Sequence, residues 1–236
     1  MRNYFVYDNI DSRTYGVYIS GSGVFNAPER NVEFISVPGR NGDLIGNEKR
    51  FENITVTYPA YLYANFKTNI QSFRNAMLSK TSYCRLTDSY HTDEYRKAIY
   101  TGDFEASPTK MLSAAEFDIS FYCKPQRFLT SGESTTTITT SGTTITNPTL
   151  YPSQPQITVT GYGDMYIGSQ KITIANQYVS VVIDSEIGDC WSGLNNANPY
   201  VTFQTDDFPV LESGSNSITF DGTITKVEIV PRWWRL

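Results

Sequence analysis

The residues best suited to chemistry in this chain are few and lie far apart. There is one histidine, His91, in the segment SYHTDEYR, and three cysteines, Cys84, Cys123 and Cys190. A Ser-His-Asp or Cys-His mechanism has to use that histidine, yet no GxSxG turn presents a nucleophile. Cys84 lies seven residues before His91, and nothing else in its surroundings marks it as a nucleophile. The sequence therefore favours a structural role for His91.

Acidic residues also occur in pairs, and paired carboxylates are what glycoside hydrolysis uses. The pairs are Asp93 with Glu94, Asp206 with Asp207 and, more loosely, Asp184 with Glu186. Adjacent residues of a strand point to opposite faces, so neighbouring carboxylates are poor candidates for facing one another. One histidine and three separated cysteines do not make a zinc site, and no loop has the EF-hand spacing. We therefore predict no enzymatic activity, no metal and no cofactor.

A glycine-rich segment, Gly161-Tyr162-Gly163-Asp164, superficially resembles a phosphate-binding loop. A P-loop needs a following helix and a Lys-Ser/Thr pair, because the backbone amides and the lysine together hold the phosphates. Neither feature follows this segment. We predict that it forms a β-hairpin turn.

Composition indicates a folded, β-rich protein. The 236 residues are 39% hydrophobic, 14% aromatic and 18% charged, with many tyrosines, phenylalanines and threonines, which favour strands. The net charge is −5 and the basic residues are scattered, so the basic stripe typical of nucleic-acid-binding proteins is missing. Neither a signal peptide nor an apolar run of about 20 residues occurs, and the cysteines are odd in number. We expect no membrane span, and assembly in a reducing cytoplasm.

The first half of the chain has the pattern of strands separated by turns. Strand-favouring segments lie at 5–7, 17–19, 32–37, 54–58, 97–104 and 116–123. The strongest turn signal combines Pro-Gly with Asn-Gly. It consists of Pro38, Gly39, Arg40, Asn41, Gly42 and Asp43. Because it separates two strand-like stretches, it predicts a hairpin or an exposed arm.

One segment, residues 65–80, has helical periodicity instead. Its apolar residues fill a stripe about one third of the helix surface wide, which predicts packing against a sheet. They are Phe66, Ile70, Phe73, Met77 and Leu78. Asn65 suits the cap position at the start, and Lys80 suits the negative end of the helix dipole.

The second half begins with a polar segment and continues with short strands. Residues 130–149 are rich in Thr and Ser, which indicates a polar strand pair at a domain junction. Further strands are expected at 156–160, 164–167, 170–174, 178–183, 200–203, 217–220 and 223–230. This spacing is typical of an antiparallel sandwich or jelly roll. We predict domains at 1–128 and 129–236, and leave open whether the last strand returns to the first domain.

Several segments, taken in order, resemble the distal tail proteins of siphophages of Gram-positive hosts. In the first half they are VPGRNG at 37–42, the helix at 65–80 and FYCKPQRF at 121–128. In the second half they are NPT at 147–149, PQITVTGYGDMYIGSQKITI at 155–174, VVIDSE at 181–186, FPVLESGSNSITFDG at 208–222 and KVEIVPRWW at 226–234. Each segment alone is weak, whereas their order and spacing together are specific.

The resemblance implies a mainly β structural protein of the virion. The first domain would be a β-sandwich with one helix and an extended hairpin, and the second a galectin-like antiparallel β-sandwich. Six copies would form a baseplate ring at the tail tip, leaving a lumen for DNA that the protein does not bind specifically. Its partners would be the major tail tube protein, the tail-associated lysin or fibre hub, and receptor-binding or adaptor proteins. About 110 residues follow Gln126, which leaves no room for an inserted carbohydrate-binding module.

Two alternatives remain at this stage. The ring would use the turn at Pro38–Asp43 to reach a neighbouring copy, whereas the same turn in isolation would be a plain surface turn. A carbohydrate-binding baseplate module would instead use an aromatic platform, and core packing or subunit contact would compete for the same rings. The candidates are Trp191, Tyr200, Trp233 and Trp234. A cell-wall hydrolase is disfavoured because the catalytic residues are missing.

Overall fold

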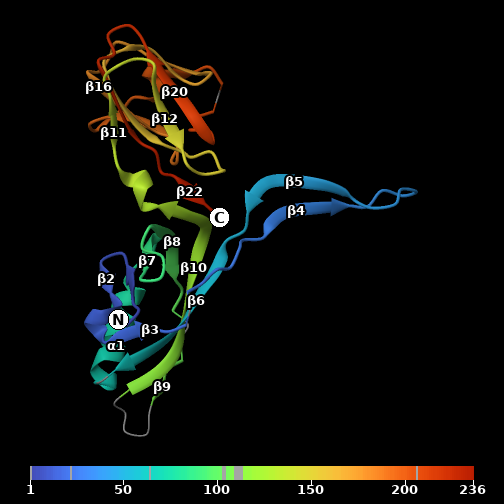
Figure 1. The fold of residues 1–236 in the computed structure, drawn as a ribbon, viewed down its shortest axis with the longest axis vertical. Coiled ribbons are helices and arrows are strands. Elements are labelled where there is room, and N and C mark those ends of the chain that lie inside the picture. Colours follow the sequence, from blue (N-terminus) through green and yellow to red (C-terminus); the bar gives the residue numbers. More distant parts are fainter. Residues whose placement is uncertain (1, 22, 64, 103–104, 109–113, 206) are drawn as a thin grey trace. The chain divides into compact units, whose positions relative to one another are not determined.

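The chain consists of two compact units in a computed structural model (Figure 1). The structure describes residues 2–21, 23–63, 65–102, 105–108, 114–205 and 207–236, without the side chains of 47–49. The first unit is Met1–Arg127 with Leu236, and the second is Phe128–Arg235. The predicted boundary after residue 128 falls beside this division. The predicted mainly β fold is confirmed.

The first unit is built from strands, one α-helix and one short 3-10 helix. The strands are β1 (Phe5–Tyr7), β2 (Ile10–Asp11), β3 (Val17–Ile19), β4 (Arg30–Ile35), β5 (Leu44–Phe51), β6 (Ile54–Tyr63), β7 (Cys84–Asp88), β8 (Glu94–Tyr100), β9 (Ser107–Pro108) and β10 (Ala114–Leu129). The helices are η1 (Ser12–Tyr15) and α1 (Phe66–Leu78). The strand predicted at 97–104 is observed three residues earlier, as β8, and residues 103–104 lie outside the described residues.

The main sheet has the order β2-β1-β7-β8-β10-β6-β3, with β9 also paired to β10. β6 and β10 alternate between buried and exposed residues, as an antiparallel sheet with one buried face requires. Two strands separate β1 from β10 in this order, yet the rings of Phe5 and Phe121 are 5.3 Å apart. The sheet therefore curls over its own buried face.

The helix α1 covers part of that buried face. Ile70, Phe73 and Met77 are buried in the core, and the Phe5 and Phe73 rings meet edge to face at 6.3 Å. Leu78 was predicted to share this stripe, but it is 48% exposed.

The predicted cap of α1 is also wrong in its mechanism. Asn65 has a left-handed backbone (φ 54°) and its side chain makes no capping hydrogen bond. Its carbonyl oxygen accepts the N–H groups of Thr68 and Asn69 instead. Lys80, predicted to interact with the helix dipole, makes an ion pair with Asp8. The helix thus starts with local backbone hydrogen bonds, and the residue Lys80 beyond its end makes a tertiary ion pair.

The second unit consists of two sheets around a shared apolar core. Its elements are η2 (Thr130–Glu133), β11 (Thr136–Ile138), β12 (Thr143–Asn147), β13 (Gln156–Thr160), β14 (Gly163–Ile167), β15 (Gln170–Ile174), β16 (Ser180–Asp184), β17 (Asp189–Ser192), β18 (Asn195–Asn196), η3 (Asn198–Tyr200), β19 (Val201–Phe203), β20 (Gly214–Phe220), β21 (Lys226–Val230) and β22 (Trp234–Arg235). One sheet has the order β11-β21-β13-β16-β17-β18, and the other β12-β20-β14-β15-β19. Side chains of both sheets form one buried cluster, which makes this unit a β-sandwich.

Two local predictions in this unit are wrong. The strands of the polar segment do not pair with each other, because β11 pairs with β21 in one sheet and β12 with β20 in the other. The segment at Gly161 is not a hairpin turn either, since β13 and β14 belong to different sheets. Gly161 (φ +106°) carries the chain across at a place where a Cβ would lie 2.2 Å from the Thr223 carbonyl oxygen. Only glycine fits that approach.

The chain enters and leaves the second unit at one place. The N–H of Leu129 donates to the Trp233 carbonyl oxygen at 2.8 Å, and the N–H of Arg232 donates to the Gly132 carbonyl oxygen at 2.8 Å. β21 lies inside the second unit's sheet. The short β22 pairs with β10, whose last two residues belong to the second unit.

Candidate assembly surface

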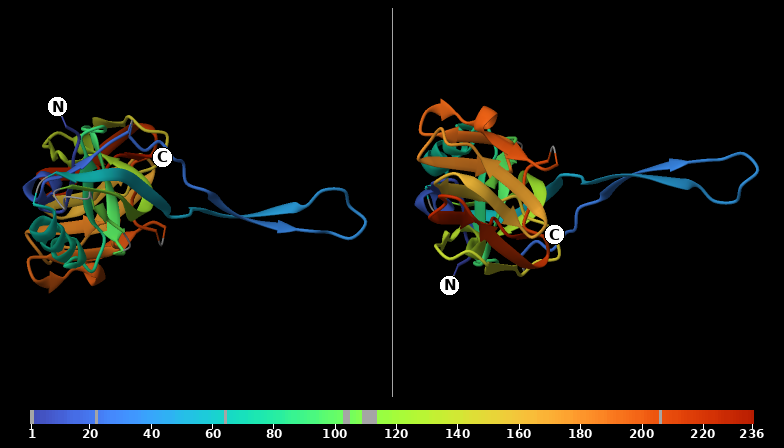
Figure 2. Two further views of the ribbon diagram at one scale, coloured as in Figure 1. Left: turned by 90° about the horizontal axis from the view of Figure 1, so that it is seen from below. Right: turned by 90° about the horizontal axis from the view of Figure 1, so that it is seen from above.

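The most exposed element of the first unit is the β4–β5 hairpin, here called the arm (residues 30–51). Its two strands pair only with each other, and the hairpin stands away from the curled sheet of its own unit (Figure 2). An isolated two-stranded hairpin is marginally stable in water. The arm therefore receives little support from the sheet of its own unit.

The arm presents large apolar side chains on both of its faces. Phe34 pairs with Ile45, and Ile35 pairs with Leu44. Successive residues of a strand point to opposite faces, so the first pair lies on one face and the second pair on the other. Phe34 and Ile45 are each 66% exposed, Ile35 44% and Leu44 39%. Exposing them on both faces indicates that a partner covers the arm.

The tip of the arm is a shaped turn. The N–H of Arg40 donates to the Val37 carbonyl oxygen at 3.1 Å, and Gly39 between them has φ +80°. Proline at the second turn position and a positive φ at the third are the features of a type II turn. The predicted turn Pro38–Asp43 is thus observed, with the Arg40 and Asp43 side chains exposed.

The root of the arm is held on the first unit by side chains that the sequence did not single out. The Asn26 side-chain amide donates to the Thr55 carbonyl oxygen at 2.9 Å. Arg127, which makes an ion pair with buried Glu94 at 3.3 Å, also reaches the Asn26 carbonyl oxygen at 3.4 Å. These contacts join the chain before β4 to β6 and β10.

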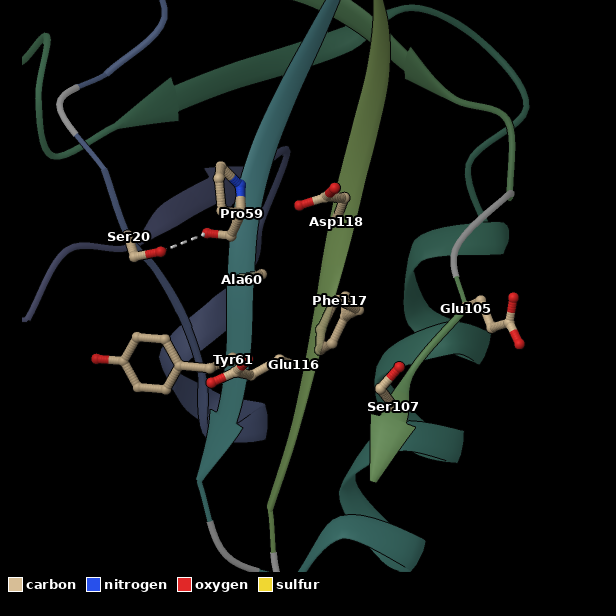
Figure 3. A pocket seen from close by; sticks show the side chains of 9 residues that line it. All are labelled: Ser20, Pro59, Ala60, Tyr61, Glu105, Ser107, Glu116, Phe117 and Asp118. Atoms are coloured by element: carbon tan, nitrogen blue, oxygen red, sulfur yellow. Dashed lines mark hydrogen bonds between the residues drawn. The ribbon is translucent and has the colours of Figure 1, made fainter. Parts of the chain in front are cut away.

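The outer face of the same unit has a hollow of about 480 Å³ between β3, β6, β9 and β10 (Figure 3). Glu116 of β10 lies between Tyr61 of β6 and Ser107 of β9 in the sheet register, and Asp118 lies opposite Pro59. Glu116 and Asp118 are both exposed. Within the described residues, neither carboxylate has a hydrogen-bond or ion-pair partner.

The histidine and its neighbours have structural partners. His91 Nδ1 lies 3.1 Å from Asp88 Oδ1, the Tyr58 hydroxyl donates to Asp88 Oδ2 at 2.7 Å, and the Phe25 ring meets the His91 ring edge to face at 5.1 Å. Burial and the Asp88 carboxylate raise the pKa of Tyr58 well above its usual value. Within the described contacts His91 faces Asp88 and Phe25 rather than Cys84.

The thiols are free, and two of them are buried. Burial raises the pKa of Cys123 and of Cys190 to about 12, so both remain protonated at neutral pH. No three His, Cys, Asp or Glu side chains gather as a metal site in the part of the chain that the structure describes.

The paired carboxylates likewise act in structure. Arg232 forms a bidentate ion pair with buried Asp184 (2.6 and 2.7 Å) and lies 3.6 Å from Glu186. Glu94 is buried, whereas Asp93 is exposed. Asp206 lies outside the described residues, so its pairing with Asp207 is not described.

The aromatic candidates of the second unit occupy different surroundings. Trp233 is buried in the core, and Trp234 stacks on Tyr151 at 4.6 Å and donates its indole N–H to the Pro152 carbonyl oxygen. Trp191 is half-buried on β17. Tyr200 is half-buried and meets Tyr178 edge to face at 5.6 Å.

Comparison with known proteins assigns the first unit to a family. Residues 10–123 match the family model described as a phage tail protein RIFT-related domain. By its first unit, the chain is similar to this phage tail protein family. The match contains the arm, the hollow and α1. None of the helices in the described residues has the length and apolar character to span a bilayer.

The fold extends the likeness to both units. The solved structure of SPP1 Dit (gp 19.1), described as a paradigm of the hub adsorption apparatus in phages infecting Gram-positive hosts, matches with a TM-score of 0.79. The alignment covers 100% of each chain at 14% sequence identity. A search of curated proteins by sequence found no match. The resemblance to siphophage distal tail proteins is thus confirmed by the family match of the first unit and by the fold of the whole chain.

Proposed function

We propose that the chain is a distal tail protein of a siphophage-type virion and acts as a structural hub without enzymatic activity. Six copies form a ring, which joins the tail tube protein on one face to the tail-associated lysin or fibre hub on the other. The ring leaves an axial channel for DNA. The observation that carries this proposal is the fold likeness to SPP1 Dit over the whole of both chains, together with the tail-protein family of the first unit.

The arm supplies a physical means of making the ring. From Arg30 to Asn41 the chain advances eleven residues, which at about 3.3 Å each gives a reach of roughly 36 Å. A compact unit of this size has a radius of gyration of about 14 Å, and so a width of roughly 35 Å if it is nearly spherical. The arm is therefore long enough to cross one neighbouring copy. Burial of its apolar pairs supplies the association energy.

Size-exclusion chromatography with light scattering tests the ring directly. We expect a mass of about 160 kDa, six times 26.6 kDa, and ring-shaped particles in negative-stain images. The matched control is a chain with the arm shortened by replacing residues 32–45 with a two-residue Asn-Gly turn, which should remain folded and monomeric. A full-length chain that stays monomeric at high micromolar concentration contradicts the proposal.

Carbohydrate binding remains the alternative, and Trp191 and Tyr200 are its best candidates, because Trp233 is buried and Trp234 stacks on Tyr151. Pull-down on host cell-wall polysaccharide separates the two functions. Binding by a strict monomer that is lost in Trp191→Ala favours the alternative. Zymography on host cell walls tests the absence of hydrolysis, and lysis would contradict it.

A further inference from the structure

The hollow on the outer face of the first unit has the charge and position to receive part of another molecule. Glu116 and Asp118 are two residues apart on the same face of β10, so their Cα atoms are about 6.7 Å apart. Both carboxylates therefore project from the same face of β10, where an approaching cation meets two negative charges. Figure 3 shows both beside Tyr61 and Pro59, with the Glu105 side chain pointing away from them.

The surroundings suit a protein segment. The lining combines two carboxylates with the Tyr61 ring, the Pro59 ring and the hydroxyls of Ser20 and Ser107. Tyrosine contributes a large contact area together with a polar group, and it is enriched in interfaces between proteins. A cationic, turn-shaped segment would fill such a hollow.

The arm tip is a segment of this kind. Arg40 is exposed directly after the Pro38-Gly39 turn, and its side chain has no partner among the described residues. The arm points away from the sheet of its own unit (Figures 1 and 2), so it presents Arg40 to a different molecule. A planar guanidinium pairs with carboxylates through two parallel hydrogen bonds, which fixes its orientation.

We propose that the hollow is the docking site for the arm tip of a second copy, with Arg40 facing Glu116 and Asp118. The proposal rests on the proposed ring, and it adds which surface of the neighbour each arm reaches. One apolar face of the arm then covers the outer face of the sheet that carries Tyr61. Each copy inserts its arm tip into one neighbour and binds the arm tip of the other neighbour in its hollow, as a head-to-tail ring requires.

Disulfide crosslinking between two differently tagged copies tests this docking site. One copy carries Arg40→Cys and the other carries Asp118→Cys. Both copies also carry Cys84→Ser, because Cys84 is half-buried, whereas the other two thiols are buried and protonated. On co-expression and mild oxidation, we expect a crosslinked dimer that carries both tags. The matched control is Thr55→Cys, exposed on the same outer face of β6, which should crosslink to Arg40→Cys much less.

Measuring the mass of the same samples distinguishes failure of the proposed docking site from failure of the proposed ring. The docking site is contradicted if oligomers form without a crosslink between positions 40 and 118. It is also contradicted if position 40 crosslinks equally to positions 55 and 118. Both results are still consistent with the ring. In the first case the hollow is free for a different tail protein. If the chain is a monomer and no crosslink forms, both the ring and the docking site are contradicted.

A charge exchange gives a second, independent test. Arg40→Glu should raise the dissociation constant of the oligomer by about fivefold or more at low salt, because it removes an ion pair worth up to about fivefold and adds repulsion between like charges. Adding Glu116→Lys and Asp118→Lys to the same chain should restore association. If the combined variant associates no better than Arg40→Glu alone, the pairing is wrong.

Discussion

At the scale of single residues, the ion pair of Arg232 and Asp184 is a bidentate polar contact of the second unit with a buried carboxylate. Burial alone would raise the pKa of Asp184, but the hydrogen bonds from Arg232 and Gln156 outweigh it and lower the pKa below its ordinary value. The stabilisation is therefore present above about pH 4 and is lost as the pH falls through the lowered pKa. Acid should weaken the second unit through this residue.

Replacing Arg232 by Met leaves the Asp184 carboxylate buried without its cation. We expect Arg232→Met to lower the free energy of unfolding of the second unit by about 2–3 kcal/mol at pH 7. This is less than the cost of breaking a fully buried pair, because Arg232 is partly exposed. In the variant burial raises the pKa of Asp184, so the difference from the parent chain should shrink as the pH approaches 4. Urea unfolding at both pH values measures this.

The control is Lys226→Met, which removes the exposed ion pair with Glu228. It should leave the urea midpoint nearly unchanged. Equal effects of the two variants, or an effect of Arg232→Met that does not vary with pH, would contradict the assigned role.

The chain crossing at Gly161 gives a second prediction at this scale. Gly161→Ala should destabilise the second unit by more than about 2 kcal/mol, because the added Cβ meets the Thr223 backbone at 2.2 Å and the positive φ is strained. Gly168→Ala is the matched control, since Gly168 also has a positive φ (+58°) but nothing lies within 4 Å of its Cβ position. Only about 1–2 kcal/mol is expected there. Similar thermal midpoints for the two variants would refute the steric argument.

At the scale of elements, the arm should be needed for association and dispensable for folding. Phe34→Ser combined with Ile45→Ser removes one apolar face, and burial of each side chain contributes about 1.5–3 kcal/mol. The dissociation constant of the oligomer should rise more than about 100-fold. The thermal midpoint of the dissociated chain should not change, since both side chains are exposed.

Leu194→Ser is the control for that prediction. Leu194 is fully exposed in the second unit, so the substitution tests whether any exposed apolar residue has the same effect. We expect the oligomer to keep its mass. If Leu194→Ser dissociates the oligomer and the arm variant does not, the second unit makes the ring contacts instead.

Sequence periodicity was sufficient for elements that bury one face. β6, β10 and α1 follow their apolar patterns, because burial decides their side-chain directions. Sequence periodicity was insufficient where long-range strand pairing decides which sheet a strand joins. The Thr-rich strands β11 and β12 look like partners but belong to different sheets, and Gly161 looks like a hairpin turn although it crosses between sheets.

The candidate surface was predictable only in part. The Pro-Gly turn marks the arm tip, whereas the apolar doublets Phe34-Ile35 and Leu44-Ile45 were a missed signal for an arm that is apolar on both faces. The hollow could not be predicted, because its carboxylates meet Tyr61 and Ser107 only through the register of β6, β9 and β10.

At the scale of the whole molecule, each unit has its own core. The buried residues of the second cluster all fall within 138–233, so the fragment 128–236 should fold alone. We expect a cooperative urea transition and a β-type circular dichroism spectrum for this fragment. A non-cooperative transition would show that the first unit is required for its stability.

The adjacent hydrogen bonds at Leu129 and Arg232 also bear on how such a protein changes over evolution. A module whose two ends meet at one point can be replaced by another with similarly spaced ends, and the host unit keeps its strand order. Recombination at this single junction would therefore exchange the second unit alone. The first unit, with its arm and its hollow, would be inherited unchanged.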